Sequence, residues 1–337
     1  MAHAGVTVSI ITPTYNHEKF IGDCISSVLS QDYDSWEMLI VDDGSTDNTF
    51  AVASEYALHD SRIRMMRQEH RGMSQLNVTY NAALKRASGE YVAILEGDDY
   101  WPTNKLSTQL GMHATRPDVI LSHGDTVVVE RDGAERRYCR PPQVGETRST
   151  TYLRWLLLRQ SCIMPVSVIV RSASLQQIGG FQQHPLLPSV DYVSLLRLAK
   201  LPGYFSFIPT TLGCWRQSLN QQTNSWGWRE AEAALAIALE EFRSLPTVQG
   251  RSLDIDERDI VRANMKKTIL PATLRAMRQA LVRRAKTEAR RCAVRLIKEG
   301  SPLQRLEGVS GLLASDLGWN LECVFHAIDA SKRIGRR

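Results

Sequence analysis

The chain has 337 residues, 43% of them hydrophobic, which is enough for one large domain or for a catalytic domain with an appendage. Its net charge of +5 is mild, and its six scattered cysteines show no CxxC or Cys/His spacing, which argues against a zinc site and a disulfide framework. No signal peptide and no apolar run of the roughly 18 residues that cross a bilayer is visible. These features favour a cytoplasmic protein.

Residues 6–123 alternate between short apolar runs and segments with apolar residues at helical spacing. This alternation predicts βαβ units and a mostly parallel sheet in an α/β fold. The expected strands are 6–12, 38–41, 63–67 and 91–95. The expected helices are 18–31, one that Ser45 or Thr46 caps and that ends near 59, and one within 72–87.

The second part of the chain is less regular. We expect strands at 119–123, 166–170 and 204–208, a hairpin arm at 126–130, helices at 104–115, 173–178 and 193–199, and an irregular loop at 136–151. Gln, Asn and Ser accumulate in 218–227, which places a soft boundary there, and everything beyond Trp226 is predicted to be helical.

Three carboxylates follow the strand expected at 91–95. Glu96, Asp98 and Asp99 lie within four residues, and Gly97 allows a sharp turn between them. Packed carboxylates coexist at neutral pH only with a cation or hydrogen-bond donors among them, and oxygen ligands suit Mg²⁺ or Mn²⁺. A solvated acidic turn is the alternative, and this stretch alone leaves both interpretations open.

The loops after three of the predicted strands are polar or acidic. In open α/β sheets ligands bind beyond the carboxyl ends of the strands, so we expect 13–16, 42–47 and 96–101 to line one crevice. No GxGxxG follows the first strand and no GxxxxGK[ST] occurs. The sequence therefore offers neither the dinucleotide-binding fingerprint nor a P-loop.

Several short motifs occur in a telling order: 8–16, 40–49, 87–91, 96–99, 178–181, Asp191 and 215–216. Together they resemble the inverting family 2 glycosyltransferases with a GT-A fold, over about the first two thirds of the chain. Residues 40–49 match that family's VDDGSTDNT segment closely, and 96–99 look like its metal-binding DxD position. Each motif is weak alone, whereas their order and spacing together are specific.

The resemblance assigns donor-binding roles. It implies that Pro13 and Tyr15 pack against the nucleobase and that Asp43 accepts a hydrogen bond from it, which suits the imide of uracil or thymine in a UDP- or dTDP-sugar. It also implies that Asp98 coordinates the Mn²⁺ or Mg²⁺ that bridges the donor diphosphate. As an alternative, Asp42 or Asp43 serves only as a helix N-terminal cap.

Other positions are less settled. Glu96 stands where the family usually has Asp, which leaves open whether it contacts metal, ribose or neither. Asp99 is expected to orient the donor sugar, with a structural turn role as the alternative. Arg216 matches a late family arginine that could reach a phosphate, and a surface salt bridge is the alternative. Tyr80 precedes Asn81 where many relatives carry Arg-Asn, so a donor contact from that helix is in doubt.

Asp191 matches the family's catalytic base. Inverting transfer needs one base to remove the proton of the attacking hydroxyl, and an Asp with an ordinary pKa of about 3.9 would need burial or concerted transfer to serve. Asp191 also directly precedes a predicted helix, where an Asp commonly acts as N-cap. We favour the catalytic role, mainly because of the resemblance.

The C-terminal region is strongly basic. Residues 258–298 contain 13 Lys or Arg against Asp259 and Glu288, a balance of 13 − 2 = +11. Pro271 is expected at the first turn of an amphipathic helix. Such a helix could lie on anionic lipid at the inner face of the membrane, pack on the catalytic domain, or bind nucleic acid, although no recognition motif accompanies the charge. The helices could also supply a self-association face for a homo-oligomer.

We therefore expect a GT-A catalytic domain at 1–222, with a nucleotide-sugar half at about 1–123 and an acceptor half at about 124–222, and a helical basic region at 223–337. The expected activity is metal-dependent, inverting transfer of one sugar from a nucleotide-diphosphate sugar to a glycan, a lipid-linked or a small-molecule acceptor. The alternative is a protein that keeps the fold and binds nucleotide sugar or glycan without turnover.

Overall fold

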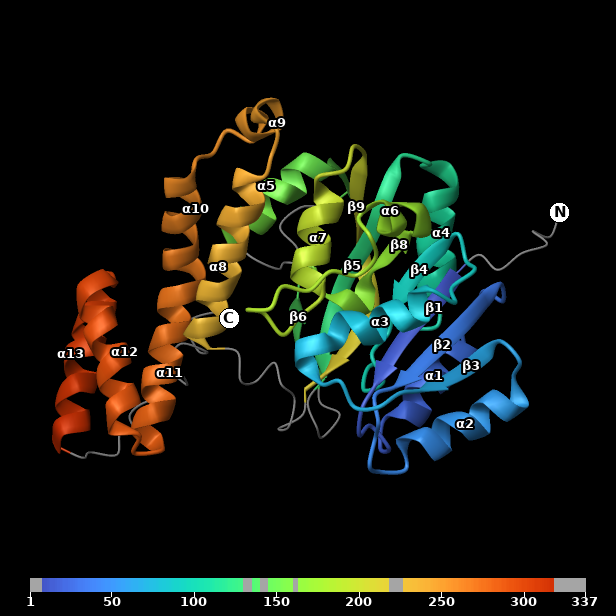
Figure 1. Ribbon diagram of the computed structural model, residues 1–337, viewed down its shortest axis with the longest axis horizontal. Coiled ribbons are helices and arrows are strands. Elements are labelled where there is room, and N and C mark those ends of the chain that lie inside the picture. The colour runs from blue at the N-terminus through green and yellow to red at the C-terminus, as the bar shows by residue number, and fades with distance from the viewer. Residues whose placement is uncertain (1–7, 130–134, 140–144, 160–162, 218–226, 318–337) are drawn as a thin grey trace. The chain divides into compact units, whose positions relative to one another are not determined.

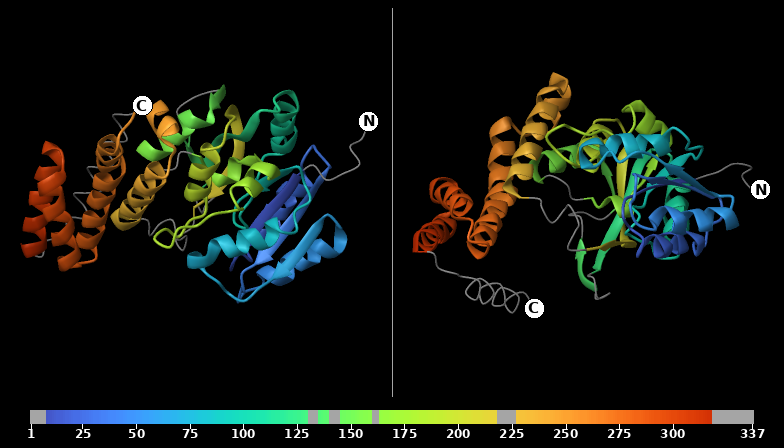
Figure 2. Two further views of the ribbon diagram at one scale, coloured as in Figure 1. Left: turned by 45° about the horizontal axis from the view of Figure 1, so that its top comes forward. Right: turned by 60° about the horizontal axis from the view of Figure 1, so that its bottom comes forward.

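A computed structural model describes residues 8–129, 135–139, 145–159, 163–217 and 227–317 (Figure 1, Figure 2). The chain divides into two compact units. The first comprises Met1–Leu157, Ser161–Gln221 and Pro246–Leu253, and the second comprises Leu158–Gln160, Gln222–Leu245 and Asp254–Arg337. Within the described residues, no helix is both long and apolar enough to span a bilayer.

The first unit is built on a mixed sheet with the strand order β3-β2-β1-β4-β8-β5-β9-β7, and β6 pairs with β5. Its strands are β1 (Val8–Thr14), β2 (Trp36–Asp42), β3 (Ile63–Arg67), β4 (Tyr91–Ile94), β5 (Val119–Val129), β6 (Glu135–Cys139), β7 (Gly145–Arg148), β8 (Ile169–Arg171) and β9 (Tyr204–Arg216). β1 to β4 run parallel to one another, β9 runs parallel to β5, and the other pairings are antiparallel. The predicted α/β fold with a mostly parallel mixed sheet is confirmed.

The first unit also contains helices. They are α1 (Ile21–Leu29), α2 (Thr49–His59), α3 (Leu76–Leu84), α4 (Lys105–Thr115), α5 (Ser149–Arg159), α6 (Ser172–Gln177), α7 (Asp191–Ala199) and α9 (Thr247–Ser252), with short 3₁₀ turns at Met73–Gln75 and Pro165–Ser167. β1 and β2 are buried along their whole lengths because both sheet faces are covered. This burial explains why they read as continuous apolar runs.

The prediction of an irregular loop at 136–151 is wrong. β6 and β7 lie in this stretch, and α5 begins at Ser149. β7 has the sequence Gly-Glu-Thr-Arg and forms only by antiparallel pairing with β9 at the edge of the sheet. A polar four-residue edge strand has no hydrophobic pattern to detect. Its partner also lies some 60 residues away in the chain, so no nearby turn reveals the pairing.

Two other boundaries differ from expectation. β5 is one continuous strand, whose end pairs with β6 as the predicted hairpin, and β9 continues to Arg216 rather than ending near residue 208. The helix after β2 begins only at Thr49. Asp47, rather than Ser45 or Thr46, accepts the hydrogen bond from the Thr49 N–H group, at 3.0 Å.

The second unit is helical where it is described. It contains α8 (Trp228–Arg243), α10 (Glu257–Asn264), a π-helical turn (Met265–Ile269), α11 (Leu270–Val282), α12 (Lys286–Glu299) and α13 (Pro302–Leu317). Its core joins α11, α12 and α13 through small and apolar side chains that include Met277, Leu281, Ala293 and Leu296. Pro271 lies in the first turn of α11, as predicted, and the backbone before it is already helical from Asn264 to Leu270. The π-turn accommodates the proline, which has no N–H group to donate.

Candidate active site

The ends of three parallel strands meet at one edge of the sheet. Thr14 of β1 is paired with Asp42 of β2, and the next residue, Asp43, donates its N–H to the Thr14 carbonyl at 2.9 Å. On the other side, Gly97 donates to the Pro13 carbonyl at 3.0 Å. A Cβ on Gly97 would lie 2.4 Å from the Thr14 hydroxyl oxygen, so only glycine allows the β4 loop to approach β1 this closely. The predicted convergence of these loops is present.

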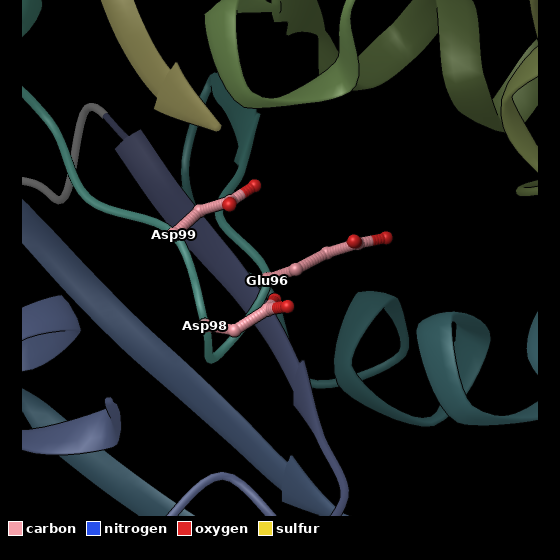
Figure 3. Close-up of side chains that lie close together, drawn as sticks. All are labelled: Glu96, Asp98 and Asp99. Atoms are coloured by element: carbon pink, nitrogen blue, oxygen red, sulfur yellow. The ribbon is translucent and has the colours of Figure 1, made fainter. Parts of the chain in front are cut away.

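Glu96, Asp98 and Asp99 form an acidic cluster after β4. One carboxylate oxygen of each lies within 4.8 Å of the others, and the side chains extend to the same side of the loop (Figure 3). Asp98 and Asp99 are buried. Burial and the charge of Asp98 raise the pKa of Glu96 to about 7, and burial with the charges of Asp98 and Glu96 raises the pKa of Asp99.

The cluster fits a hard divalent cation. Its donors are all carboxylate oxygens, the ligand type that Mg²⁺ and Mn²⁺ prefer. Burial is the main cause of the raised pKa values and repulsion among the carboxylates adds to it, so a cation among them would relieve both. The His17 ring faces Asp98, with its Nε2 3.9 Å from the carboxylate, and this ring is cationic only when protonated.

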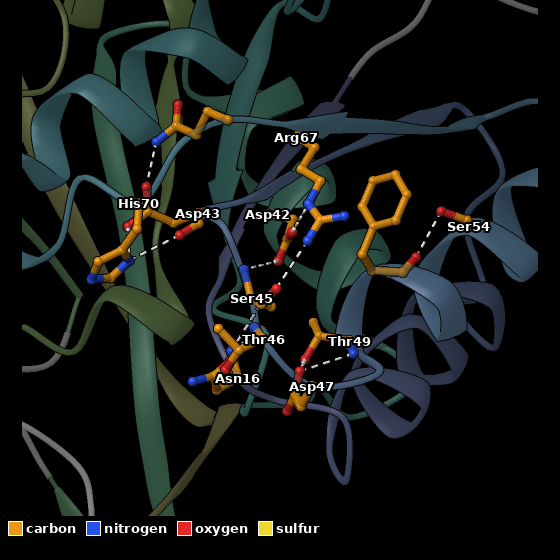
Figure 4. A network of polar contacts seen from close by, with 12 residues as sticks. Asn16, Asp42, Asp43, Ser45, Thr46, Asp47, Thr49, Ser54, Arg67 and His70 are labelled. Carbon is orange, nitrogen blue, oxygen red and sulfur yellow. Dashed lines mark hydrogen bonds and ion pairs between the residues drawn. The ribbon is translucent and has the colours of Figure 1, made fainter.

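Asp43 anchors the loop of residues 68–72. Its carboxylate accepts hydrogen bonds from the main-chain N–H groups of Arg71, at 3.0 Å, and Gly72, at 2.9 Å, and from the Gln68 amide. The His70 ring lies 3.1 Å from the same carboxylate (Figure 4). A hydrogen bond from a nucleobase to Asp43 would have to share or replace one of these contacts.

Tyr15 presents a partly exposed ring beside this loop. Its side chain stacks on His70 with ring centroids 4.1 Å apart, and 37% of the residue is exposed. Pro13, in contrast, is buried within β1. A planar base that packs on Tyr15 would therefore use the free part of the ring or displace His70.

Asp42 has a different environment from Asp43. It is fully buried, its carboxylate lies 3.2 Å from Nε of Arg67, and it accepts a hydrogen bond from the Ser45 N–H group (Figure 4). Asn16 links β1 to the same turn, because its side chain accepts the Thr46 N–H and its own N–H donates to the Ser45 hydroxyl. Asp42 therefore supports the turn that carries Asp43.

Arg216 is held by the protein itself. Its guanidinium pairs with Asp23 at 2.7 Å, and its ring neighbours are Phe20 and Tyr100. Its main-chain N–H donates to the Asp99 carboxylate at 2.9 Å. The end of β9 is thus fixed against the acidic cluster, and a phosphate contact by Arg216 would have to compete with Asp23.

Asp191 is the first residue of α7, one position after the cap residue Val190. Its carboxylate accepts a hydrogen bond from Ser189, and burial raises its pKa although this bond opposes the shift. Asp191 lies near enough to the acidic cluster for its charge to contribute, after burial and Asp98, to the raised pKa of Glu96. The structure therefore brings the carboxylate expected to be the base to the side of the cluster.

A family comparison identifies the chain. The family model described as "Glycosyl transferase family 2" matches residues 9–179. The chain belongs to glycosyltransferase family 2. It is 47% identical over 225 residues, which cover 67% of this chain and 84% of the relative, to "Putative teichuronic acid biosynthesis glycosyltransferase TuaG" of Bacillus subtilis (strain 168).

Further relatives agree with this membership. Over 194 residues the family 2 chain is 37% identical to the "UDP-Glc:alpha-D-GlcNAc-diphosphoundecaprenol beta-1,3-glucosyltransferase WfgD" of Escherichia coli, covering 57% of this chain and 70% of that one. Its fold is similar to that of S. aureus TarS 1-349 in complex with UDP-GlcNAc, with a TM-score of 0.64 at 16% identity over 92% and 90% of the two chains. As a member of this family, the protein is a glycosyltransferase.

The structure joins two departures from the family pattern. Tyr80 of α3, which stands where many relatives are expected to carry Arg, is buried, and its hydroxyl donates to the Glu96 carboxylate. Asn81 instead holds the turn after α6, since its side chain exchanges two hydrogen bonds with the main chain of Phe181. Sequence reasoning missed this Tyr80–Glu96 pair, because residues 16 apart reveal no contact by spacing alone.

His17 was also missed. It follows β1 in the loop that carries Tyr15, and its ring lies 3.2 Å from the Thr14 hydroxyl and faces Asp98. Its position in the strand-end loop was the signal that could have identified it.

Proposed function

We propose that this glycosyltransferase transfers one sugar, with inversion at the anomeric carbon, from a UDP- or dTDP-sugar by direct displacement, and that it needs Mn²⁺ or Mg²⁺. The observation that carries the proposal is the proximity of a carboxylate cluster suited to a cation and a separate half-buried carboxylate, Asp191, with a raised pKa. Inverting transfer needs these two elements, one for the leaving diphosphate and one for the acceptor hydroxyl.

Asp98 is proposed as the principal metal ligand, with Glu96 and Asp99 as neighbouring donors. A bound cation would offset the negative charge that grows on the departing nucleotide diphosphate. Tyr80 holds Glu96 in place, and the Arg216 N–H holds Asp99. A solved mannosyltransferase of Pyrobaculum calidifontis, at TM-score 0.53, 20% identity and 94% and 87% coverage of the two chains, is in complex with GDP-Man and Mn²⁺.

For the donor base, we propose that Tyr15 supplies the stacking surface and Pro13 the adjoining wall. Asp43 receives the imide N–H of uracil or thymine by sharing one of its loop contacts. Asp43 also keeps the 68–72 loop beside Tyr15. Arg216 reaches the diphosphate only if its pairing with Asp23 is exchanged.

Asp191 is proposed as the general base. Burial raises its pKa toward that of a useful base, while hydrogen bonds from the Ser189 hydroxyl and from the main chain of Tyr192 oppose this shift and orient the carboxylate. Below this raised pKa the carboxylate is protonated, so transfer should be lost as the pH falls.

We propose a lipid-linked diphosphate sugar as the acceptor, in a polysaccharide pathway at the inner face of the membrane. This proposal rests on WfgD and TuaG, whose names refer to a diphosphoundecaprenol acceptor and to teichuronic acid. In this scheme residues 1–222 carry catalysis, with a donor half at about 1–123 and an acceptor half at about 124–222, and the helical region 223–337 supplies the membrane contact.

A donor panel tests the proposal. Purified protein is incubated with UDP-, dTDP- and GDP-sugars in Mn²⁺, Mg²⁺ or EDTA, with and without a lipid-linked diphosphate sugar, and nucleotide diphosphate release is measured. We expect release from one uracil or thymine donor, dependent on metal and increased by acceptor. Binding of a nucleotide sugar without turnover under any condition would contradict the transfer mechanism and favour a non-catalytic binding protein.

A further inference from the structure

The outermost face of α13 is unusual for a helix. Leu303, Leu306, Val309 and Leu313 are 65%, 67%, 45% and 56% exposed. They follow one another at steps of three and four residues and therefore share one face. A helix in a bundle that faces water usually buries such a stripe. These exposed side chains therefore indicate a surface that binds a partner.

The opposite face of α13 fixes which side of the helix is exposed. Gly308, Gly311, Ala314 and Ser315 are buried. A Cβ on Gly308 would lie 2.8 Å from the Ala293 carbonyl of α12, and one on Gly311 would lie 2.4 Å from the sulfur of Met277 in α11. The helix therefore packs closely through its small residues, and rotation that buried the leucines would force them into space that admits only glycine.

The helical segment that carries the stripe is positively charged. Residues 270–317, which form α11, α12 and α13, contain ten Lys or Arg and four Asp or Glu, a balance of 10 − 4 = +6. Both carboxylates of α13 are already paired, Glu307 with Arg278 at 3.0 Å and Asp316 with Arg290 at 2.7 Å. The apolar stripe thus belongs to a three-helix segment that carries an excess of positive charge.

We propose that the Leu303–Leu313 face of α13 docks on an anionic phospholipid surface. Leucines on an interfacial helix enter the boundary between headgroups and acyl chains, while Lys and Arg of the same segment are attracted by the anionic headgroups. A second copy of the chain would bring the same positive charge to the contact and be repelled, so charge complementarity favours the lipid. The inference rests on the membrane contact proposed above for residues 223–337 and names the surface that makes it, which requires neither donor nor acceptor.

The test is co-sedimentation of the full-length protein with vesicles of phosphatidylcholine, with or without about one-third phosphatidylglycerol, at about 0.05 M and about 0.5 M NaCl. We expect binding only to the anionic vesicles and mainly at low salt. The variant Leu306→Gln with Leu313→Gln should bind at least about tenfold more weakly, because two leucines no longer enter the interface. A matched control is Leu58→Gln with Val248→Gln, which alters residues 85% and 83% exposed in the first unit and should bind like the parent.

Several results would overturn the proposal. Parent protein that stays in solution with anionic vesicles, or a Leu306/Leu313 variant that binds as well as the parent, excludes lipid docking by this face. A parent oligomer in light scattering that the variant converts to monomer, without vesicle binding, assigns the stripe to self-association. A lower unfolding temperature of the variant with unchanged vesicle binding assigns it to contacts within the chain, with residues 318–337 outside the described part as the occupant. Because donor hydrolysis is measured separately, these results test the membrane contact proposed for residues 223–337 and not the transfer reaction.

Discussion

The β4 loop and the outer face of α13 both keep side chains where they are unfavourable, but the side chains are of opposite kinds. The loop gathers three carboxylates and buries two of them, whereas α13 exposes leucines and buries glycines. Each arrangement lowers stability in the isolated chain and becomes favourable with a partner: a cation for the loop, an apolar anionic surface for the helix. The difference shows that the chemical type of an unfavourably placed side chain indicates which partner it binds: buried carboxylates indicate a cation, and exposed leucines indicate an apolar surface.

The largest expected effect is on transfer, at the base proposed beside the acidic cluster. Asp191→Asn removes the proposed base and should lower the rate of transfer by about 10²- to 10⁴-fold, while the affinity for the donor stays unchanged. Single-turnover transfer and calorimetric titration of UDP measure the two quantities. The control is Asp34→Asn, whose side chain is 98% exposed. Near-normal transfer by Asp191→Asn would remove this residue from the catalytic role.

A matched pair of leucines tests the orientation of α13. Leu296 of α12 is fully buried and Leu306 of α13 is 67% exposed. Leu296→Ala should therefore lower the free energy of unfolding by about 2–5 kcal/mol, and Leu306→Ala should change it by less than about 0.5 kcal/mol. Denaturant unfolding of both variants checks the contrast, and equal losses would show that the stripe is covered.

Glu37 contrasts with the acidic cluster, because hydrogen bonds and an ion pair stabilise its charged form. Burial opposes ionisation of Glu37, but hydrogen bonds from Ser9 and Ser88 and the charge of Arg64 outweigh it and lower its pKa below 4.5. A lowered folded-state pKa contributes stability above the unfolded value that is lost as the pH falls through the folded value. Glu37→Gln should lose about 1–3 kcal/mol at pH 7, with a difference from the parent that shrinks below about pH 4.5. A difference that is constant from pH 3 to 7 in urea titrations would contradict the assignment.

The smallest effect is expected for Tyr80→Phe. It removes only the hydroxyl that holds Glu96, so kcat/KM should fall by about tenfold while the unfolding temperature changes little. Tyr91→Phe, in a buried tyrosine at the start of β4, is the control and should keep full activity. If Tyr80→Phe were fully active, Glu96 would not depend on this hydrogen bond for its position.

The sequence predicted the first four strands and the convergence of their loops because these elements are local and because β1, β2 and β4 are buried along their whole lengths. It did not predict β7, which exists only by pairing with β9, nor the single helix across Pro271, which depends on a π-turn. Among site residues, the cluster followed from one short stretch. The bonds that hold Asp43, Arg216 and Glu96 could not be predicted, because loop geometry decides which distant residue each side chain meets.

The most direct test of the central claim is calorimetric titration of Mn²⁺ into the protein with and without UDP, for the parent and for Asp98→Asn. Cooperative binding is expected, with UDP increasing the affinity for Mn²⁺ in the parent and no such increase in Asp98→Asn, because the acidic cluster would hold the cation against the diphosphate. UDP that binds the parent equally well in EDTA and in Mn²⁺, with Asp98→Asn indistinguishable from it, would contradict a metal-dependent donor site at the end of β4.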